Sequence, residues 1–258
     1  MIMDTHMHTC FSSDATMKLQ EAIAQSGELG IGITITEHMD LAYPEPGQFI
    51  FDVDAYFREY GPYRNERLLL GVEIGMRPDC LEDNRKLAKG YPFDYIIGSV
   101  HVINNIDLYW QSFYEGRTKK EIYTCYFDSM LECVAGHDFI HSLGHIDYIA
   151  RYAPFADTNV YYEEFKEQID PVLTLLAKRE QALEINTKRP LTPDALRLLV
   201  PVYQRFAELG GRYVTIGSDA HRASEIGRDF AAAFDFAAHC GLRPVWFQEG
   251  KPRYMRRD

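Results

Sequence analysis

Seven short apolar segments alternate with longer amphipathic segments, and this alternation limits the fold more than any other feature of the sequence. The apolar segments, which have the length of buried β-strands, are residues 1–6, 30–38, 68–75, 94–101, 138–147, 182–186 and 213–219. Repeated strand–helix units require parallel strands joined by helical crossovers. We therefore expect an α/β barrel of the TIM type with seven strands, and an open doubly wound sheet is the alternative. Because no linker divides the chain, residues 1–258 are expected to form one domain.

Four of the segments between the apolar runs have apolar residues at helical spacing. They are residues 15–29, 119–134, 161–180 and 192–209. Ser13 or Asp14 is expected to cap the first helix, because short polar side chains accept hydrogen bonds from the first helical N–H groups. Thr192 followed by Pro193 is the usual order of residues at a helix start and predicts where the last helix begins.

The balance of charges argues against some classes of partner. The 258 residues include 38 acidic and 27 basic side chains, a formal net charge of −11, so no nucleic-acid partner is expected. No apolar run reaches the roughly 20 residues of a membrane span, and the N-terminus lacks the basic region of a signal peptide. The five cysteines form no CxxC pair, which fits free thiols and a cytoplasmic location. The sequence does not determine the oligomeric state.

Histidine and carboxylate side chains stand at or just beyond the ends of most of the apolar segments. In α/β barrels the active site forms at the carboxyl ends of the strands. Residues i and i+2 share one face of a strand, so His6 and His8 can bind one ion, and Asp219 and His221 repeat this spacing. The complete set of candidate metal ligands is His6, His8, Asp14, His38, Glu73, His101, His145, Asp219 and His221.

The types of side chain in this set indicate the kind of metal. Imidazole and carboxylate ligands without cysteine suit Zn²⁺, Mn²⁺ or Fe²⁺ better than Mg²⁺ or Ca²⁺. Nine ligands are too many for one tetrahedral ion, so the sequence predicts a cluster of two or three ions in which Glu73 is able to bridge. Such a cluster has a net positive charge and would attract a phosphate to an otherwise acidic protein.

Three histidines in residues 136–147 are four residues apart, a spacing that also fits one face of a helix. In a strand, four residues span about 13 Å, so only one of the three can reach the site. His145, at the carboxyl end, is therefore the expected ligand. His141 is expected in the barrel interior or its lower layer, and His137 in the loop that enters the strand.

Two arginines are candidates for binding a phosphate, because a planar guanidinium group can bond two oxygens at once. Arg222 directly follows His221, and Arg189 lies just beyond the sixth apolar segment. Arg77 and Lys188 are weaker candidates.

Six short motifs occur in order along the chain: DTHMHTCFSSDA, TEH, GVEIG, GSVH, GHID and GSDAH. They resemble the ordered motifs of the polymerase and histidinol phosphatase (PHP) superfamily, over residues 4–221. The segments GVEIGMRPD, FDYIIGSVHVINNIDLY and LEIN make the chain most similar to the monofunctional histidinol-phosphate phosphatases. The resemblance implies a distorted (β/α)₇ TIM-like barrel with a trinuclear metal site.

The resemblance also implies how three ions share the candidate ligands. The ligands implied for the first ion are His6, His8, Glu73 and Asp219. Those for the second ion are Glu73, His101 and His145, so that Glu73 bridges the two. Those for the third ion are Asp14, His38 and His221, and many family members have a histidine in the place of Asp14.

A metal-dependent phosphomonoesterase is the activity that the resemblance implies. Its expected reaction is the hydrolysis of L-histidinol phosphate to L-histidinol and phosphate in histidine biosynthesis, by attack of a metal-activated hydroxide. No other catalytic residue is assigned, and the general acid for the leaving group stays open. The alternative is a PHP phosphoesterase for another small phosphate ester, such as a nucleotide or sugar phosphate, since the same ligands serve either. A non-catalytic PHP module would have lost ligands, and none is missing.

A substrate with an imidazole and an amino group would suit acidic and aromatic side chains near the site. Residues 38–67, rich in Pro, Tyr and Phe, are expected to form a loop that borders the site. The candidate contacts are Asp40, Tyr43, Glu45 and Phe49 of this segment, with Trp110 and Tyr114 from the region after the fourth apolar segment.

Overall fold

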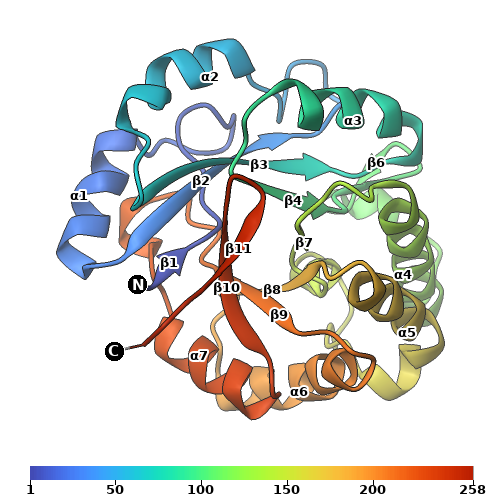
Figure 1. The fold of residues 1–258 in the computed structure, drawn as a ribbon. Helices are drawn as coiled ribbons and strands as arrows, with labels where there is room; N and C mark the ends of the chain where they lie inside the picture. The colour runs from blue at the N-terminus through green and yellow to red at the C-terminus, as the bar shows by residue number, and fades with distance from the viewer. Residues whose placement is uncertain (258) are drawn as a thin grey trace.

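Parallel strands form the centre of the molecule and helices surround them (Figure 1), in a computed structural model that describes residues 1–257. The strands are β1 (Met3–Asp4), β2 (Gly32–Met39), β3 (Leu68–Gly75), β4 (Tyr95–Ser99), β5 (Val102–Ile103), β6 (Ile106–Asp107), β7 (Ser142–Leu143), β8 (Ala182–Asn186), β9 (Tyr213–Gly217), β10 (Arg243–Gln248) and β11 (Lys251–Tyr254). The α-helices are α1 (Leu19–Leu29), α2 (Val53–Tyr60), α3 (Leu81–Gly90), α4 (Lys119–Gly136), α5 (Tyr162–Lys178), α6 (Pro193–Glu208) and α7 (Phe230–His239). Short 3₁₀ turns are η1 (Gly61–Tyr63), η2 (Pro78–Cys80), η3 (Gln111–Phe113), η4 (Tyr148–Arg151) and η5 (Ala223–Glu225).

Seven of the strands form a closed ring. They are adjacent in the order β1-β2-β3-β4-β7-β8-β9, and each neighbouring pair is parallel. The ring closes beyond β1, where the Thr5 N–H donates to the Ile216 carbonyl at 3.0 Å and the Asp219 N–H donates to the His6 carbonyl at 2.8 Å. The predicted seven-stranded barrel is therefore confirmed and the open sheet is excluded. The barrel is distorted because β1 and β7 are only two residues long.

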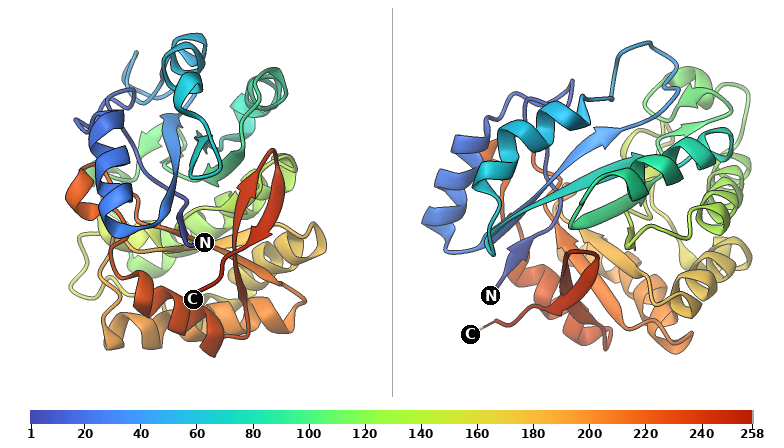
Figure 2. Two further views of the ribbon diagram at one scale, coloured as in Figure 1. Left: turned by 60° about the vertical axis from the view of Figure 1, so that its left-hand side comes forward. Right: turned by 45° about the horizontal axis from the view of Figure 1, so that its top comes forward.

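The register of the parallel strands brings the ends of the apolar segments to one edge of the barrel. His38 of β2 lies opposite Glu73 of β3, and Met7 forms a parallel bridge with Ala220. Figure 2 shows from two further directions that the helices remain outside the strands. The loops that follow the strands are thus free to build a site at the carboxyl edge.

A hairpin of β10 and β11, which crosses the middle of the ring in Figure 1, covers the opposite end of the barrel. β10 runs parallel to the start of β9 and antiparallel to β11. The turn residues Glu249 and Gly250 have φ values of 52° and 70°, as a two-residue type I′ turn requires. The Gly250 N–H donates to the Asp94 carbonyl, directly before β4. The hairpin therefore closes the amino-terminal end of the barrel and leaves the carboxyl end open.

Two clusters of buried apolar side chains hold the elements together. The larger cluster contains residues from the ring strands and from the helices around them, and the smaller one lies under the hairpin. The smaller cluster consists of Tyr95, Ile97, Ala182, Val245 and Phe247. Within residues 1–257, none of the helices combines the length and the apolar character needed to cross a membrane.

Two local expectations need correction and one is confirmed. Helix α1 begins at Leu19, and its first turn is capped through the Lys18 N–H, which donates to Glu21 Oε2 at 2.6 Å, so neither Ser13 nor Asp14 caps it. Residues 38–67 are not a loop throughout, because residues 53–60 form α2. Thr192 does cap α6, where its Oγ1 accepts from the Ala195 N–H at 3.2 Å.

Candidate metal centre

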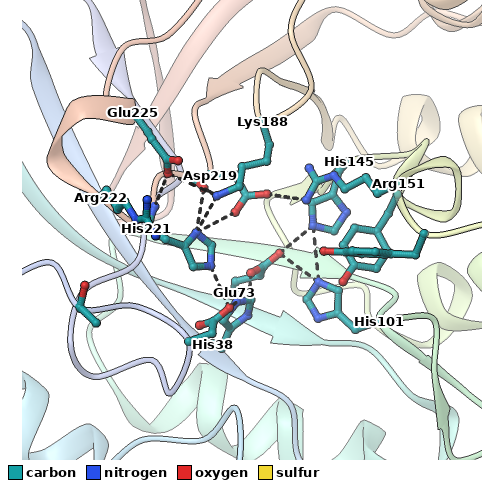
Figure 3. Close-up of a pocket in the computed structure, with 14 residues that line it drawn as sticks. His38, Glu73, His101, His145, Arg151, Lys188, Asp219, His221, Arg222 and Glu225 are labelled. Atoms are coloured by element: carbon teal, nitrogen blue, oxygen red, sulfur yellow. Dashed lines mark hydrogen bonds and ion pairs between the residues drawn. The ribbon is translucent and has the colours of Figure 1, made fainter. Parts of the chain in front are cut away.

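The nine candidate ligands come together at the open end of the barrel, and Figure 3 shows those that line its cavity. Seven of them line a cavity of about 470 Å³, and the other two, His6 and His8, are fully buried beside it. The seven are Asp14, His38, Glu73, His101, His145, Asp219 and His221. The nine residues come from six different strand ends and the loop after β1, so the ring closure is what assembles them.

Glu73 stands at the centre, with each carboxylate oxygen facing a different pair of histidines. Its Oε2 lies 3.3 Å from His6 Nε2 and 3.5 Å from His8 Nε2. Its Oε1 lies 3.0 Å from His145 Nε2 and 3.4 Å from His101 Nε2. Two ligand atoms, each about 2.1 Å from one tetrahedral ion, lie roughly 3.4 Å apart. The spacing on both sides of Glu73 therefore matches ligands that share an ion.

Unpaired buried atoms also fit a metal. Glu73 Oε2 and His38 Nδ1 are buried, and neither makes a hydrogen bond within residues 1–257. They lie 2.9 Å apart without being aligned for one. Leaving a buried carboxylate oxygen without a partner is costly, whereas coordination to a cation would satisfy it.

A third group of ligand atoms lies at the mouth of the cavity. Asp14 Oδ2 is 2.9 Å from His221 Nε2 and 3.6 Å from His38 Nε2. The rings of His38 and His8 are stacked with their centroids 4.0 Å apart, so this group adjoins the one around Glu73. Although burial acts in the opposite direction, hydrogen bonds from His221 and His38 hold the pKa of Asp14 well below its usual range. Asp14 is therefore ionised and able to bind a cation.

Two further carboxylates orient the candidate ligands. Glu184 Oε1 lies 2.6 Å from His6 Nδ1, and Glu184 Oε2 accepts from the His145 N–H at 2.7 Å. Asp40 Oδ1 lies 2.8 Å from His101 Nδ1. A carboxylate on Nδ1 holds the proton there and leaves Nε2 free for a metal. Sequence reasoning missed Glu184, although it is two residues before Asn186 on β8 and therefore shares its face.

The pKa values of two candidate ligands, Glu73 and His8, match the deprotonated forms. For His6, His38 and His101, burial lowers the pKa, but nearby carboxylates outweigh it and raise the pKa above its usual value. Burial would raise the pKa of Glu73, but the nearby His6, His38 and His101 bring it well below its usual value. Burial, together with His38 and His221, brings the pKa of His8 well below its usual value. Metal binding requires ionised carboxylates and neutral imidazoles, and Glu73 and His8 are already in those forms.

Three cationic side chains line the same cavity: Arg151, Lys188 and Arg222 (Figure 3). Arg151 donates to Asp219 Oδ2 at 2.9 Å and to Asn186 Oδ1 at 2.7 Å. Lys188 donates to the Asp219 carbonyl at 2.9 Å. Sequence reasoning missed Arg151 because it lies in the turn η4, six residues beyond His145, where no strand spacing marks it.

The structure does not bring Arg189 to this cavity. Its guanidinium group donates to Asp147 Oδ2 at 2.8 Å, and it borders a separate small pocket between residue 147 and the start of α6. Of the two arginines that the sequence suggests, only Arg222 lines the cavity.

The three evenly spaced histidines lie in three different environments. His145 faces Glu73, as described above. His141 lies under the C-terminal hairpin, where its ring stacks on Phe247 at 4.9 Å and its Nδ1 accepts from the Ile96 N–H at 3.0 Å. His137 ends helix α4 with its Nδ1 2.8 Å from the Cys133 carbonyl. His141 and His137 therefore have structural partners at the places expected for them.

Comparisons with known proteins agree with this geometry. The family described as the PHP domain matches residues 4–188. A protein named "Probable histidinol-phosphatase" from Clostridium acetobutylicum is 46% identical over 254 residues, which cover 98% of this chain and 100% of that protein. The protein named "Histidinol-phosphatase" from Lactococcus lactis is 31% identical, over 86% of this chain and 84% of its own.

A solved structure extends the likeness to three dimensions. The crystal structure of histidinol phosphate phosphatase from Lactococcus lactis, complexed with zinc, L-histidinol and phosphate, superposes with a TM-score of 0.89. The match covers 98% of both chains at 29% identity. The family match extends over more than half of the chain, and the sequence relatives cover most of it. This chain belongs to the PHP family.

Proposed function

We propose that this chain hydrolyses L-histidinol phosphate to L-histidinol and phosphate as a metal-dependent phosphomonoesterase, with residues 1–258 acting as one domain. The observation that carries the proposal is Glu73, whose two carboxylate oxygens face different pairs of histidines at ligand spacing. The names of the relatives support the substrate, and the Lactococcus lactis crystal structure combines zinc with the two products of this reaction.

The ligand groups support three divalent ions, with zinc, manganese or iron as candidates. The proposed ligands of the first ion are His6, His8, Glu73 and Asp219. Those of the second are Glu73, His101 and His145, and those of the third are Asp14, His38 and His221. Divalent ions bound there would lower the pKa of water and offset the charge of the phosphoryl oxygens.

The cationic side chains of the cavity are proposed to bind the phosphate. Arg222 presents a guanidinium group at the cavity wall, and Arg151 and Lys188 lie on the same wall beside Asp219. A guanidinium group bonds two phosphate oxygens at once and holds the ester in one orientation. Arg189, the other arginine suggested by the sequence, would first have to leave Asp147.

The proposal is tested by comparing kcat/KM for L-histidinol phosphate, a nucleoside monophosphate, a sugar phosphate and p-nitrophenyl phosphate in the metal-loaded protein. The highest value is expected for L-histidinol phosphate. Glu73→Gln should lose turnover of every ester while keeping its fold. The matched control is Glu82→Gln on the exposed face of α3, which should behave like the unchanged chain. A higher kcat/KM for another ester would overturn the assignment of the substrate.

A further inference from the structure

A second cavity, of about 260 Å³, adjoins the metal centre. Five residues line both cavities, so the two lie directly side by side. The shared residues are Asp14, His38, His101, Tyr148 and Tyr152. A phosphate ester held at the metal centre by its phosphate would therefore have room for its organic part in the second cavity.

The two cavities differ in charge. The larger contains Arg151, Lys188 and Arg222, whereas no Lys or Arg is among the described residues that line the smaller one. Aromatic rings form much of its wall, including Tyr43, Phe49 and Tyr109. Two carboxylates that the larger cavity lacks, Asp40 and Asp107, also face it. A wall of aromatic faces and carboxylates favours a positively charged organic group.

Of the two carboxylates in the smaller cavity, Asp107 is the one whose negative charge is not directed at a candidate metal ligand. Asp40 lies at hydrogen-bonding distance from His101 Nδ1, which commits it to a candidate metal ligand. Asp107, at the end of β6, is 5% exposed and accepts only from uncharged donors. Its Oδ2 accepts from the Tyr43 hydroxyl at 2.5 Å and its Oδ1 from the Tyr109 N–H at 2.6 Å. Within the part of the chain that the structure describes, it forms no ion pair with a Lys, Arg or His side chain.

The donors to Asp107 also fix its direction. Burial raises the pKa of Tyr43 far above its usual value, and the hydrogen bond to Asp107 raises it further. The hydroxyl therefore keeps its proton and donates. The Tyr109 and Tyr152 rings meet edge to face at 5.2 Å on the same wall. The carboxylate thus has a fixed orientation beside aromatic faces, and a bound cation would reach it without displacing a positively charged partner.

We infer that this second cavity binds the positively charged organic part of the substrate, a protonated amine or imidazolium, and that Asp107 is the residue that selects for its charge. The inference rests on the proposed function and deepens it. It explains how one site separates the two ends of its substrate, with phosphate in the cationic cavity and the organic cation in the acidic, aromatic one. Phosphate esters whose organic part carries no charge would use only the cationic cavity.

The test compares two substrates in Asp107→Asn. The amide keeps an acceptor for the Tyr109 N–H but removes the negative charge. KM for L-histidinol phosphate should rise about tenfold to a hundredfold with a smaller change in kcat, whereas both constants for p-nitrophenyl phosphate should stay within about twofold. The matched control is Asp54→Asn, because Asp54 also accepts from a tyrosine hydroxyl, that of Tyr91, but on an exposed surface. It should leave both substrates unchanged.

Equal changes for both substrates, or no change for either, would overturn the inference. If Asp107→Asn does not fold, the unchanged chain decides. At about pH 8 the imidazole is neutral, so L-histidinol phosphate acetylated on its amine has no organic cation and should have a KM at least about tenfold higher; an equal KM would refute charge selection. Inhibition by L-histidinol should weaken in Asp107→Asn while inhibition by inorganic phosphate is retained. If the unchanged, metal-loaded chain does not hydrolyse L-histidinol phosphate, the proposed function itself fails, which is a separate result.

Discussion

Glu184 Oε1 lies 2.6 Å from His6 Nδ1, and both side chains are completely buried. The other oxygen of Glu184 accepts from the main-chain N–H of His145. One carboxylate from β8 thus positions two candidate ligands that lie on opposite sides of Glu73. His6 lies on the Oε2 side of Glu73 and His145 on its Oε1 side.

Glu184→Gln should weaken metal binding, because the amide has one acceptor oxygen for the N–H groups of His6, His145 and Asn186 that bond to Glu184. Loss of such a partner lowers metal affinity about tenfold to a hundredfold. The measurement is metal content by mass spectrometry after dialysis against graded chelator, which does not depend on activity. Glu180→Gln, in an exposed pair with Arg212, is the matched control. Equal metal retention in both variants would show that Glu184 does not support the metal ligands.

His145→Ala and His137→Ala should differ although the two residues share a sequence pattern. His145→Ala removes a proposed ligand and should lose bound metal and activity. His137→Ala leaves the centre intact but removes contacts to the Cys133 carbonyl and Asn84, which should cost about 1–3 kcal/mol of unfolding free energy. Metal content, turnover and thermal unfolding measured together distinguish the two. Metal loss in His137→Ala with retention in His145→Ala would reverse the assignment.

Arg222→Ala should raise KM for every phosphate ester, by about tenfold, because it removes a charged contact to the group that all these esters share. Arg189→Ala should change KM much less, since its guanidinium group is paired with Asp147 outside the cavity. Steady-state kinetics of both variants with two esters gives the comparison. A larger rise in KM for Arg189→Ala would show that this arginine leaves Asp147 when substrate binds.

Acid should destabilise the chain through His141. Burial lowers the pKa of His141 from its ordinary 6.5 to about 4, so the unfolded state takes up a proton before the folded state does. The contribution of this group to stability is complete above about pH 6.5 and falls as the pH approaches 4, by about 2–3 kcal/mol. His141→Gln keeps an acceptor for the Ile96 N–H but does not titrate.

The test is the difference between the urea unfolding free energies of the unchanged chain and His141→Gln, both freed of metal, from about pH 7 to about pH 4.5. The chain with His141 should lose more stability than the variant over this range. If the two curves run parallel, the ring under the hairpin is not held neutral.

The sequence predicted the ring of strands and all nine side chains that meet at its open end, because both depend on local patterns. Strand spacing places His6 beside His8, and parallel pairing brings Glu73 opposite His38. Arg151 could not be found this way, since it reaches the cavity from a turn whose course depends on packing. The C-terminal hairpin was also missed, because Glu249-Gly250 is not one of the Asn-Gly or Asp-Gly pairs that mark a two-residue hairpin turn. Asp14 was assigned both as a ligand and as a possible cap, and only the fold shows that it faces His221.

Turnover measured against the number of bound ions shows whether the reaction depends on the metal centre. The chain is freed of metal with a chelator, and zinc or manganese is then added in steps while bound ions and turnover of L-histidinol phosphate are measured in the same samples. No turnover is expected without metal, and the rise in turnover should be complete when about three ions are bound per chain. Full turnover in the metal-free chain, or none at any metal content, would contradict a metal-dependent hydrolysis.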